Sequence, residues 1–251
     1  MPKDHNKEDT SGEIHSKISI RNRFKKMSTA DRLILGAAIL FFIAGVVLFV
    51  WSPVENYFRE KKMSELIELI EEGEPTFIVD RDAFVVPGEG FETFGEEVLE
   101  TSSTEDEPIQ LPEDVVLTAI GTLRIDEIDL YLPVLDRATL VPLRYGAGML
   151  KGTALPGEEG NCVLLGHRMK AYGSLFNRLG EISIGDTIVF TTIDKVKYTF
   201  IVDKILMKLD PSDLEDYIDI DSGDGIQLTL VTCTPTGVGS HRLVIVAHLE
   251  E

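Results

Sequence analysis

The chain has little cysteine and little positive charge. Its 251 residues include only two cysteines, Cys162 and Cys233, so it can form one disulfide at most and lacks the close-paired spacing of a structural zinc site. Asp and Glu number 43 against 24 Lys and Arg, a formal net charge of −19. Nucleic acid is therefore not an expected partner, because a phosphate backbone binds a basic surface. The sequence also has no GxSxG elbow, no HExxH and no phosphate-binding glycine loop.

One long run lacks charge altogether. Residues 33–51 are nineteen consecutive uncharged and mostly apolar positions, and as a helix they would span roughly 28 Å, close to the hydrocarbon thickness of a bilayer. Residues 1–32 before this run contain eight Lys and Arg against five Asp and Glu. The positive-inside rule then places the N-terminus in the cytoplasm. We therefore predict a cytoplasmic basic tail over 1–32, a single transmembrane helix over 33–51, and an extracellular remainder.

Residues 52–114 are predicted to form a juxtamembrane helix followed by an acidic linker. Over 54–72, apolar residues such as Leu66 and Ile70 recur at helical spacing between Glu and Lys. Over 74–114, thirteen Asp and Glu accompany one Arg, a composition that buries little surface and is typical of a mobile linker. Apolar residues from Phe77 to Val86 run against that trend, so part of this stretch is expected to dock on the following domain.

Residues 115–251 read as a mostly β domain. Seven or so apolar runs, among them VVLTAIGTL, NCVLLGH, IQLTLVTC and RLVIVAHL, are separated by Gly, Pro and Asp. Helical stretches between them are short. This pattern predicts a closed or nearly closed β-barrel.

Cys233 and Arg242 are candidates for chemistry because they flank one strand connection. Cys233 ends an apolar strand, and Arg242 begins the next, where alternation puts it on the same face as Val244. If the two strands pair, the guanidinium lies beside the sulfur, where it favours the thiolate and stabilises an oxyanion. Taken alone, each residue has a plainer interpretation, a buried structural thiol and a solvated edge arginine.

His167 is the third candidate. It follows the strand NCVLLG, and Gly166 permits a sharp exit that would expose the imidazole at the same end of the barrel. An imidazole can accept a proton when neutral and donate one when charged. Of the four other histidines, two lie in the N-terminal tail and one near the C-terminus, and His241 should point away from its neighbour Arg242.

The segment LVTCTPTGVGSHRL, with Gly-His-Arg upstream at 166–168, resembles the sortase family of Gram-positive bacteria. The chain order His, Cys, Arg is that of the family, whereas papain-like peptidases place Cys before His. The resemblance covers about 115–249 and includes KGTALPGEEGNCVLLGHR. It implies an eight-stranded barrel, preceded by one N-terminal transmembrane helix, and a cysteine transpeptidase in the cell membrane with its catalytic domain outside.

The resemblance also implies roles and partners. Cys233 would attack an LPxTG-like sorting signal on a surface protein or pilin, His167 would serve as acid/base, Arg242 would hold the oxyanion, and Thr232 would shape the substrate pocket. The acceptor amine would belong to a lipid-linked peptidoglycan precursor or a pilin lysine. No cofactor or metal is implied, although some relatives use calcium. Free thiolate chemistry is incompatible with a Cys162–Cys233 bridge, so Cys162 is expected to be a packed core thiol.

The subclass is left open between a pilin-type, class C-like enzyme and class D. Many pilin-type members carry a lid with Asp, Pro and an aromatic residue, and the nearest match here is Asp82-Ala83-Phe84, without the Pro. As a candidate lid, Asp82 would pair with Arg242 and Phe84 would cover Cys233. The plainer interpretation of this segment is an acidic stalk. Two functional alternatives also stay open: a thiol hydrolase acting on the same signal, and a non-catalytic, membrane-tethered binding module.

Overall fold

The computed structural model describes residues 28–84, 113–170, 173–218 and 225–250. Within these ranges the chain divides into two compact units, with the boundary between Val54 and Glu55. Helix α2 (Thr29–Glu72) is continuous, so the transmembrane and juxtamembrane helices expected separately form one element. The part of α2 that belongs to the second unit buries the predicted apolar side chains, including Met63, Leu66 and Ile70.

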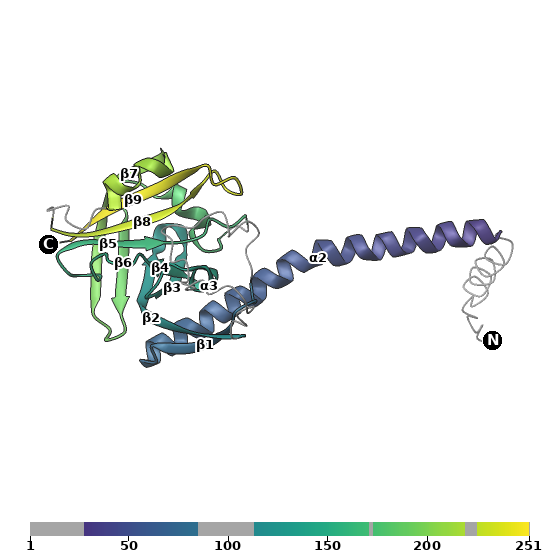
Figure 1. The fold of residues 1–251 in the computed structure, drawn as a ribbon, viewed down its shortest axis with the longest axis horizontal. Helices are drawn as coiled ribbons and strands as arrows, with labels where there is room; N and C mark the ends of the chain where they lie inside the picture. Colours follow the sequence, from purple (N-terminus) through teal and green to yellow (C-terminus); the bar gives the residue numbers. More distant parts are fainter. Residues whose placement is uncertain (1–27, 85–112, 171–172, 219–224, 251) are drawn as a thin grey trace, which may run out of the picture. The chain divides into compact units, whose positions relative to one another are not determined.

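The second unit is a closed barrel (Figure 1). Its strands are β2 (Asp114–Ile125), β3 (Leu130–Leu135), β4 (Ala147–Met149), β5 (Gly160–Leu165), β6 (Thr187–Thr192), β7 (Lys197–Leu209), β8 (Ile226–Thr234) and β9 (His241–Leu249). Around the barrel they follow the order β2-β3-β4-β5-β8-β9-β7-β6, and β6 pairs with β2 to close it. The predicted eight-stranded barrel is confirmed. Most neighbours are antiparallel, whereas β3–β4 and β5–β8 are parallel.

A ninth strand and several short helices complete the unit. β1 (Thr76–Asp80) pairs only with the first half of β2, so this part of the expected linker is a docked strand with Phe77 and Val79 buried. The short helices are η2 (Asp126–Ile128), α3 (Leu140–Tyr145), η3 (Phe176–Glu181), η4 (Pro211–Asp213) and α4 (Glu215–Ile218). The rest of the expected linker, residues 85–112, lies outside the described residues.

Strand alternation sorts apolar side chains onto the two faces of the barrel wall. Along β9, Leu243 and Ile245 point into the barrel and belong to its main core, together with Cys162, Phe190 and Phe200. Val244 and Val246 point outward and pack in a separate cluster with Leu143, Val163, Leu165, Leu214 and Val231. We call this cluster the outer apolar cluster. It covers the outer face of β5, β8 and β9.

Candidate active site

Cys233 and Arg242 lie directly opposite each other on adjacent strands. The register of β8 and β9 pairs them, as the sequence predicted for two strands joined by one connection. Directly opposed residues of an antiparallel pair have Cβ atoms roughly 4.5–5.5 Å apart. The Arg242 Nη1 donates to the carbonyl oxygens of Gly239 (2.8 Å) and His241 (3.2 Å). These bonds hold the guanidinium at the turn that follows Cys233.

His167 is brought to the same end of the barrel by the parallel pairing of β5 and β8. The printed register ends where Leu165 pairs with Val231, two residues before His167 on β5 and two before Cys233 on β8. Two hydrogen bonds extend that pairing beyond the strand, because Gly166 N donates to Val231 O (3.1 Å) and the Thr232 hydroxyl donates to Gly166 O (2.6 Å). The sequence could not supply this register, because the two strands are more than 60 residues apart in the chain.

Two of the three side chains, those of Cys233 and Arg242, lie on the outer face of the wall. Each follows the strand alternation of a residue of the outer apolar cluster two positions away, Val231 for Cys233 and Val244 for Arg242. The sequence prediction placed them at an open rim. Cys233 and Arg242 lie next to the ends of β8 and β9, and their meeting with His167 at an open rim stays a prediction.

Burial is nearly complete for two of the three residues. Cys233 and His167 are each 5% exposed, and Arg242 is partly exposed. A Cβ on Gly166 would stand 2.4 Å from the Phe176 ring, so only glycine lets the chain leave β5 beneath that ring. The His167 carbonyl accepts from Phe176 N (3.0 Å), which fixes the backbone that carries the imidazole.

Arg168 ties the His167 segment to the strand of Cys233, a role the sequence analysis did not assign. Its Nη1 donates to the Thr234 hydroxyl (2.9 Å), and its Nε donates to Asn177 O (3.3 Å). The Asn177 amide in turn donates to Met169 O (2.6 Å). The adjacency of Arg168 to His167 was the only available signal, since Thr234 is 66 positions away.

Thr232 is fully buried, and its hydroxyl is engaged by the Gly166 carbonyl. This hydrogen bond therefore joins β8 to Gly166, the residue before His167. Substrate binding by Thr232, as the resemblance implied, stays a prediction.

The two cysteines have different environments and form no disulfide. Cys162 is 1% exposed in the main core, on the opposite face of β5 from Val163 and Leu165. Burial raises the pKa of its thiol to about 12. Cys162 is therefore a packed thiol that stays protonated near neutral pH, as predicted.

The candidate lid residues make contacts with α2 and α3. The Phe84 ring packs edge-on against Tyr145 with centroids 5.7 Å apart, and the Arg59 guanidinium lies 5.6 Å from its centroid. The Asp82 N–H donates to Asp80 Oδ1 (2.8 Å), and buried Arg144 donates to the Arg81 and Ala83 carbonyls. The pairing of Asp82 with Arg242 and the covering of Cys233 by Phe84 stay predictions. Residues 85–90, which follow Phe84 directly, lie outside the described residues.

Metal ligands are not gathered anywhere in the described ranges. No group of three or more His, Cys, Asp or Glu there is placed to hold an ion.

Comparison with known proteins gives one consistent family. The model described as the sortase domain matches residues 123–250. Sortase A of Bacillus anthracis is 27% identical over 216 residues, which cover 84% of this chain and 92% of that protein. Sortase D of Bacillus subtilis is 31% identical over 118 residues, 47% of this chain and 55% of that protein. The solved structure of sortase A from Corynebacterium diphtheriae is 33% identical, covers 54% of this chain and 62% of that one, and gives a TM-score of 0.49.

Proposed function

The chain belongs to the sortase family of cysteine transpeptidases, and we propose that Cys233 is its nucleophile, His167 its acid/base and Arg242 its oxyanion partner. The single observation that carries this assignment is the register at the end of β8. Cys233 is paired with Arg242 on one side, and the β5 strand that leads to His167 is paired on the other. No subclass is assigned, because relatives named sortase A and sortase D both match.

The substrate is a peptide with an LPxTG-like sorting signal. Membership of the sortase family supports this choice. Surface proteins and pilins that end in such a signal are the partners that follow.

The reaction proceeds in two acyl transfers. The Cys233 thiolate attacks the carbonyl carbon of the Thr-Gly bond, and the resulting oxyanion is stabilised by the Arg242 guanidinium. Collapse breaks the C–N bond, and His167 donates its proton to the departing amine, which leaves a thioacyl enzyme. An incoming amine then attacks the thioester and gives its proton to His167, and the thiolate is released.

The acceptor distinguishes the two enzymatic alternatives. An amine of a lipid-linked peptidoglycan precursor or a pilin lysine gives transpeptidation, whereas water gives hydrolysis. Family membership supports transfer to an amine. The same three side chains serve both outcomes, so the product defines the activity.

The N-terminal helix supports a membrane location. A 19-residue window of α2, Thr29–Val47, is apolar and long enough to cross a bilayer, with mean hydropathy 2.1 and none of it buried in the protein. The basic residues before it favour a cytoplasmic N-terminus. In this arrangement the barrel works outside the cell, where sorting signals and wall precursors are found.

A peptide-transfer assay tests this function. A fluorogenic LPxTG peptide is incubated with the full chain in detergent, with and without an added amine, and products are identified by mass. We expect the amide of the added amine, its absence with Cys233→Ala, and its retention with Cys162→Ala as the matched cysteine control. Product formation by Cys233→Ala would overturn the nucleophile assignment. Free acid as the sole product would assign hydrolysis, and no product at all would favour the binding module.

A further inference from the structure

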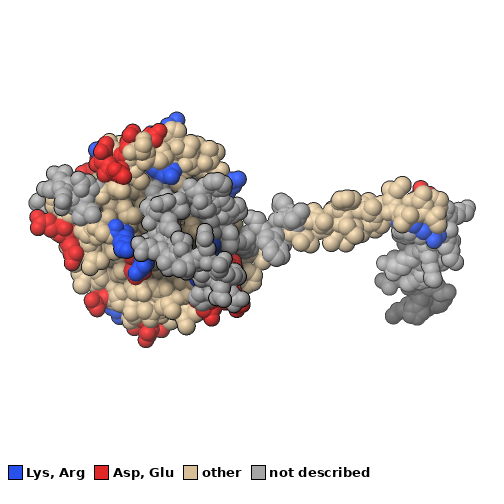
Figure 2. Space-filling view, in the orientation of Figure 1, with Lys and Arg blue, Asp and Glu red and all other residues tan. Residues whose placement is uncertain are grey.

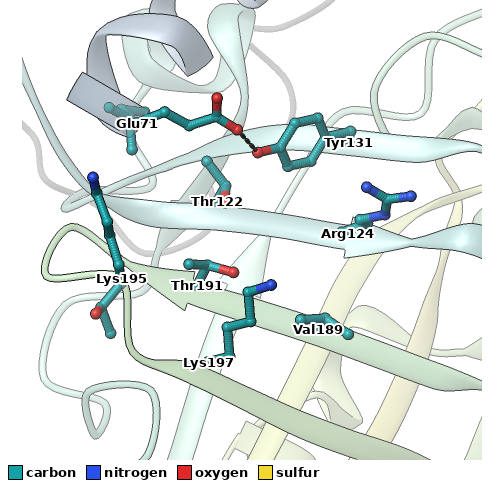
Figure 3. A pocket seen from close by; sticks show the side chains of 10 residues that line it. Glu71, Thr122, Arg124, Tyr131, Val189, Thr191, Lys195 and Lys197 are labelled. Atoms are coloured by element: carbon teal, nitrogen blue, oxygen red, sulfur yellow. Dashed lines mark hydrogen bonds between the residues drawn. The ribbon is translucent and has the colours of Figure 1, made fainter. Parts of the chain in front are cut away.

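A groove lies on the outer wall of the barrel, between the end of α2 and the β6–β7 hairpin (Figure 3). Its volume is about 450 Å³, within the range of small-ligand sites. Strand register explains which side chains share it. Tyr131, Arg124 and Val189 form one row across β3, β2 and β6, and Thr122, Thr191 and Lys197 form a second row across β2, β6 and β7.

The groove is cationic in a chain that is strongly acidic. Its lining contains Arg124, Lys195 and Lys197 against one carboxylate, Glu71, whereas the whole chain has a formal net charge of −19. On the face of the barrel drawn in Figure 2, groups of Asp and Glu lie over several parts of the surface. A local excess of positive charge in such a field concentrates anions at this one place.

Neighbouring residues already engage two of the charged groups in the groove. The Tyr131 hydroxyl donates to Glu71 Oε1 at 2.6 Å, so that carboxylate faces a neutral partner. The Arg124 Nε donates to Asp126 Oδ1 at 2.6 Å at an exposed position. Within the described ranges, Lys195 and Lys197 form no ion pair. Two ammonium groups are therefore available to a ligand from solution.

Hydroxyl groups beside these lysines complete a set of donors. The Thr192 Oγ1 accepts the Val196 N–H at 3.1 Å, which leaves its own O–H to be donated. Thr191 lies opposite Lys197 across the hairpin. In Figure 3 both lysine side chains extend toward β2, so their ammonium groups face the same groove.

The groove is far from the candidate active site. Lys197 begins β7 and Leu209 ends it, and Leu209 is the residue opposite Arg242. The length of that strand separates the two places by roughly 25–40 Å at the usual rise per residue. The groove therefore does not bind the carbonyl that Cys233 attacks.

We propose that this groove binds a phosphate group carried by a polyol or sugar. A phosphate carries more charge and more acceptor oxygens than a carboxylate, so it can accept from Lys195, Lys197 and a threonine hydroxyl together. The volume exceeds that of a bare phosphate, and the organic part of the ligand lies against Tyr131 and Val189. The second oxygen of Glu71 accepts from a ligand hydroxyl. Two kinds of ligand present this chemistry. One is a polymer whose units are linked by phosphodiesters, and the other is the headgroup of a lipid.

The test is a ³¹P-detected titration of the full chain in nonionic detergent with glycerol 1-phosphate and with an oligomer of glycerol phosphodiesters. We expect saturable binding that weakens about tenfold or more in Lys195→Gln/Lys197→Gln, because two charge-assisted contacts are lost. Lys61→Gln/Lys208→Gln is the matched control, since it removes the same charge from exposed lysines outside the groove. The control is expected to bind like the natural sequence.

Two further arms separate the sources of the phosphate. Vesicles of phosphatidylglycerol are compared with phosphatidylcholine vesicles, and gluconate replaces the phosphate probe. Binding of the soluble oligomer assigns a polymer, and binding of phosphatidylglycerol vesicles alone assigns a headgroup.

Equal weakening in both lysine pairs, equal binding of gluconate, or no saturable binding of any phosphate probe would overturn the proposal. Peptide cleavage by both variants is expected to be unchanged, and its loss in the groove variant would contradict a separate site.

Discussion

At the scale of single residues, the two cysteine thiols have different surroundings. Cys162 lies in the main core, where desolvation disfavours its thiolate, and Cys233 lies on the outer face beside a guanidinium. Neither side chain is well exposed. What separates the two thiols is therefore the charge of their surroundings and the face of the wall on which each lies.

Cys162→Ala is expected to remain active and to change the alkaline stability of the fold. The pKa of Cys162 is raised from 9.0 to about 12, so the neutral thiol contributes stability that is complete below pH 9 and is lost as pH rises toward 12. Unfolding by urea between pH 8 and 11 should show a shallower alkaline decline in Cys162→Ala than in the natural sequence. Identical slopes would mean that this thiol is not shielded from solvent.

Arg242→Lys is expected to lower kcat/KM by about 10²- to 10³-fold, the usual cost of losing an oxyanion donor. An ammonium group cannot reproduce the planar fork of donors that is fixed by the Gly239 and His241 carbonyls. Steady-state cleavage of a sorting peptide measures this effect. Arg137→Lys, at an exposed position, is the control and should be unchanged. Near-normal turnover by Arg242→Lys would remove Arg242 from the reaction.

At the scale of elements, the site depends on connections between segments that are distant in sequence. Two hydrogen bonds join the segment after β5 to β8. Arg168, the residue after His167, donates to the Thr234 hydroxyl, and Gly166, the residue before His167, accepts from the Thr232 hydroxyl. These are short hydrogen bonds between partly or fully buried groups, so they hold the backbone that carries His167 against the end of β8.

A double-mutant cycle on Arg168 and Thr234 tests that positioning. Arg168→Lys and Thr234→Val each remove the 2.9 Å bond, and each is expected to lower kcat by about tenfold with little change in KM, because a misplaced base slows chemistry more than binding. The double variant should be no worse than either single one. Additive losses, or a loss in melting temperature without a loss in kcat, would show that the bond serves folding alone.

Sequence patterns predicted the local features of these elements and missed the non-local ones. Alternation along β9 correctly placed Arg242 and Val244 on one face, and the strand runs correctly indicated a barrel. The sequence could not show that this face is the outer one, because that depends on α4 and α3 packing over Val231 and Val244. The docking of β1 on β2 and the bond from Arg168 to Thr234 also depend on long-range register that no local pattern contains.

At the scale of the whole molecule, the two units differ in how their apolar side chains are covered. Every buried core side chain in the described ranges lies after residue 55. By contrast, none of the apolar window of α2, Thr29–Val47, is buried by the rest of the protein. An exposed surface of that kind is stable only in a membrane or another apolar environment.

A chain of residues 55–251 is accordingly expected to partition into water and to cleave a soluble sorting peptide as fast as the full chain. Its core is intact, because Met63 and Leu66 on α2 are retained. Membrane fractionation and peptide kinetics measure the two expectations. A full chain that partitions into water, or a shortened chain that stays with the membrane, would refute the anchor.

The central claim is that Cys233 forms the thioacyl bond, and peptide mapping by mass spectrometry tests it most directly. The full chain is incubated with a sorting peptide, quenched in acid and digested. We predict a mass increase equal to the acyl fragment on the peptide that contains Cys233, and none on the peptide that contains Cys162. An adduct on Cys162, or cleavage of the sorting peptide by a Cys233→Ala variant, would contradict the account.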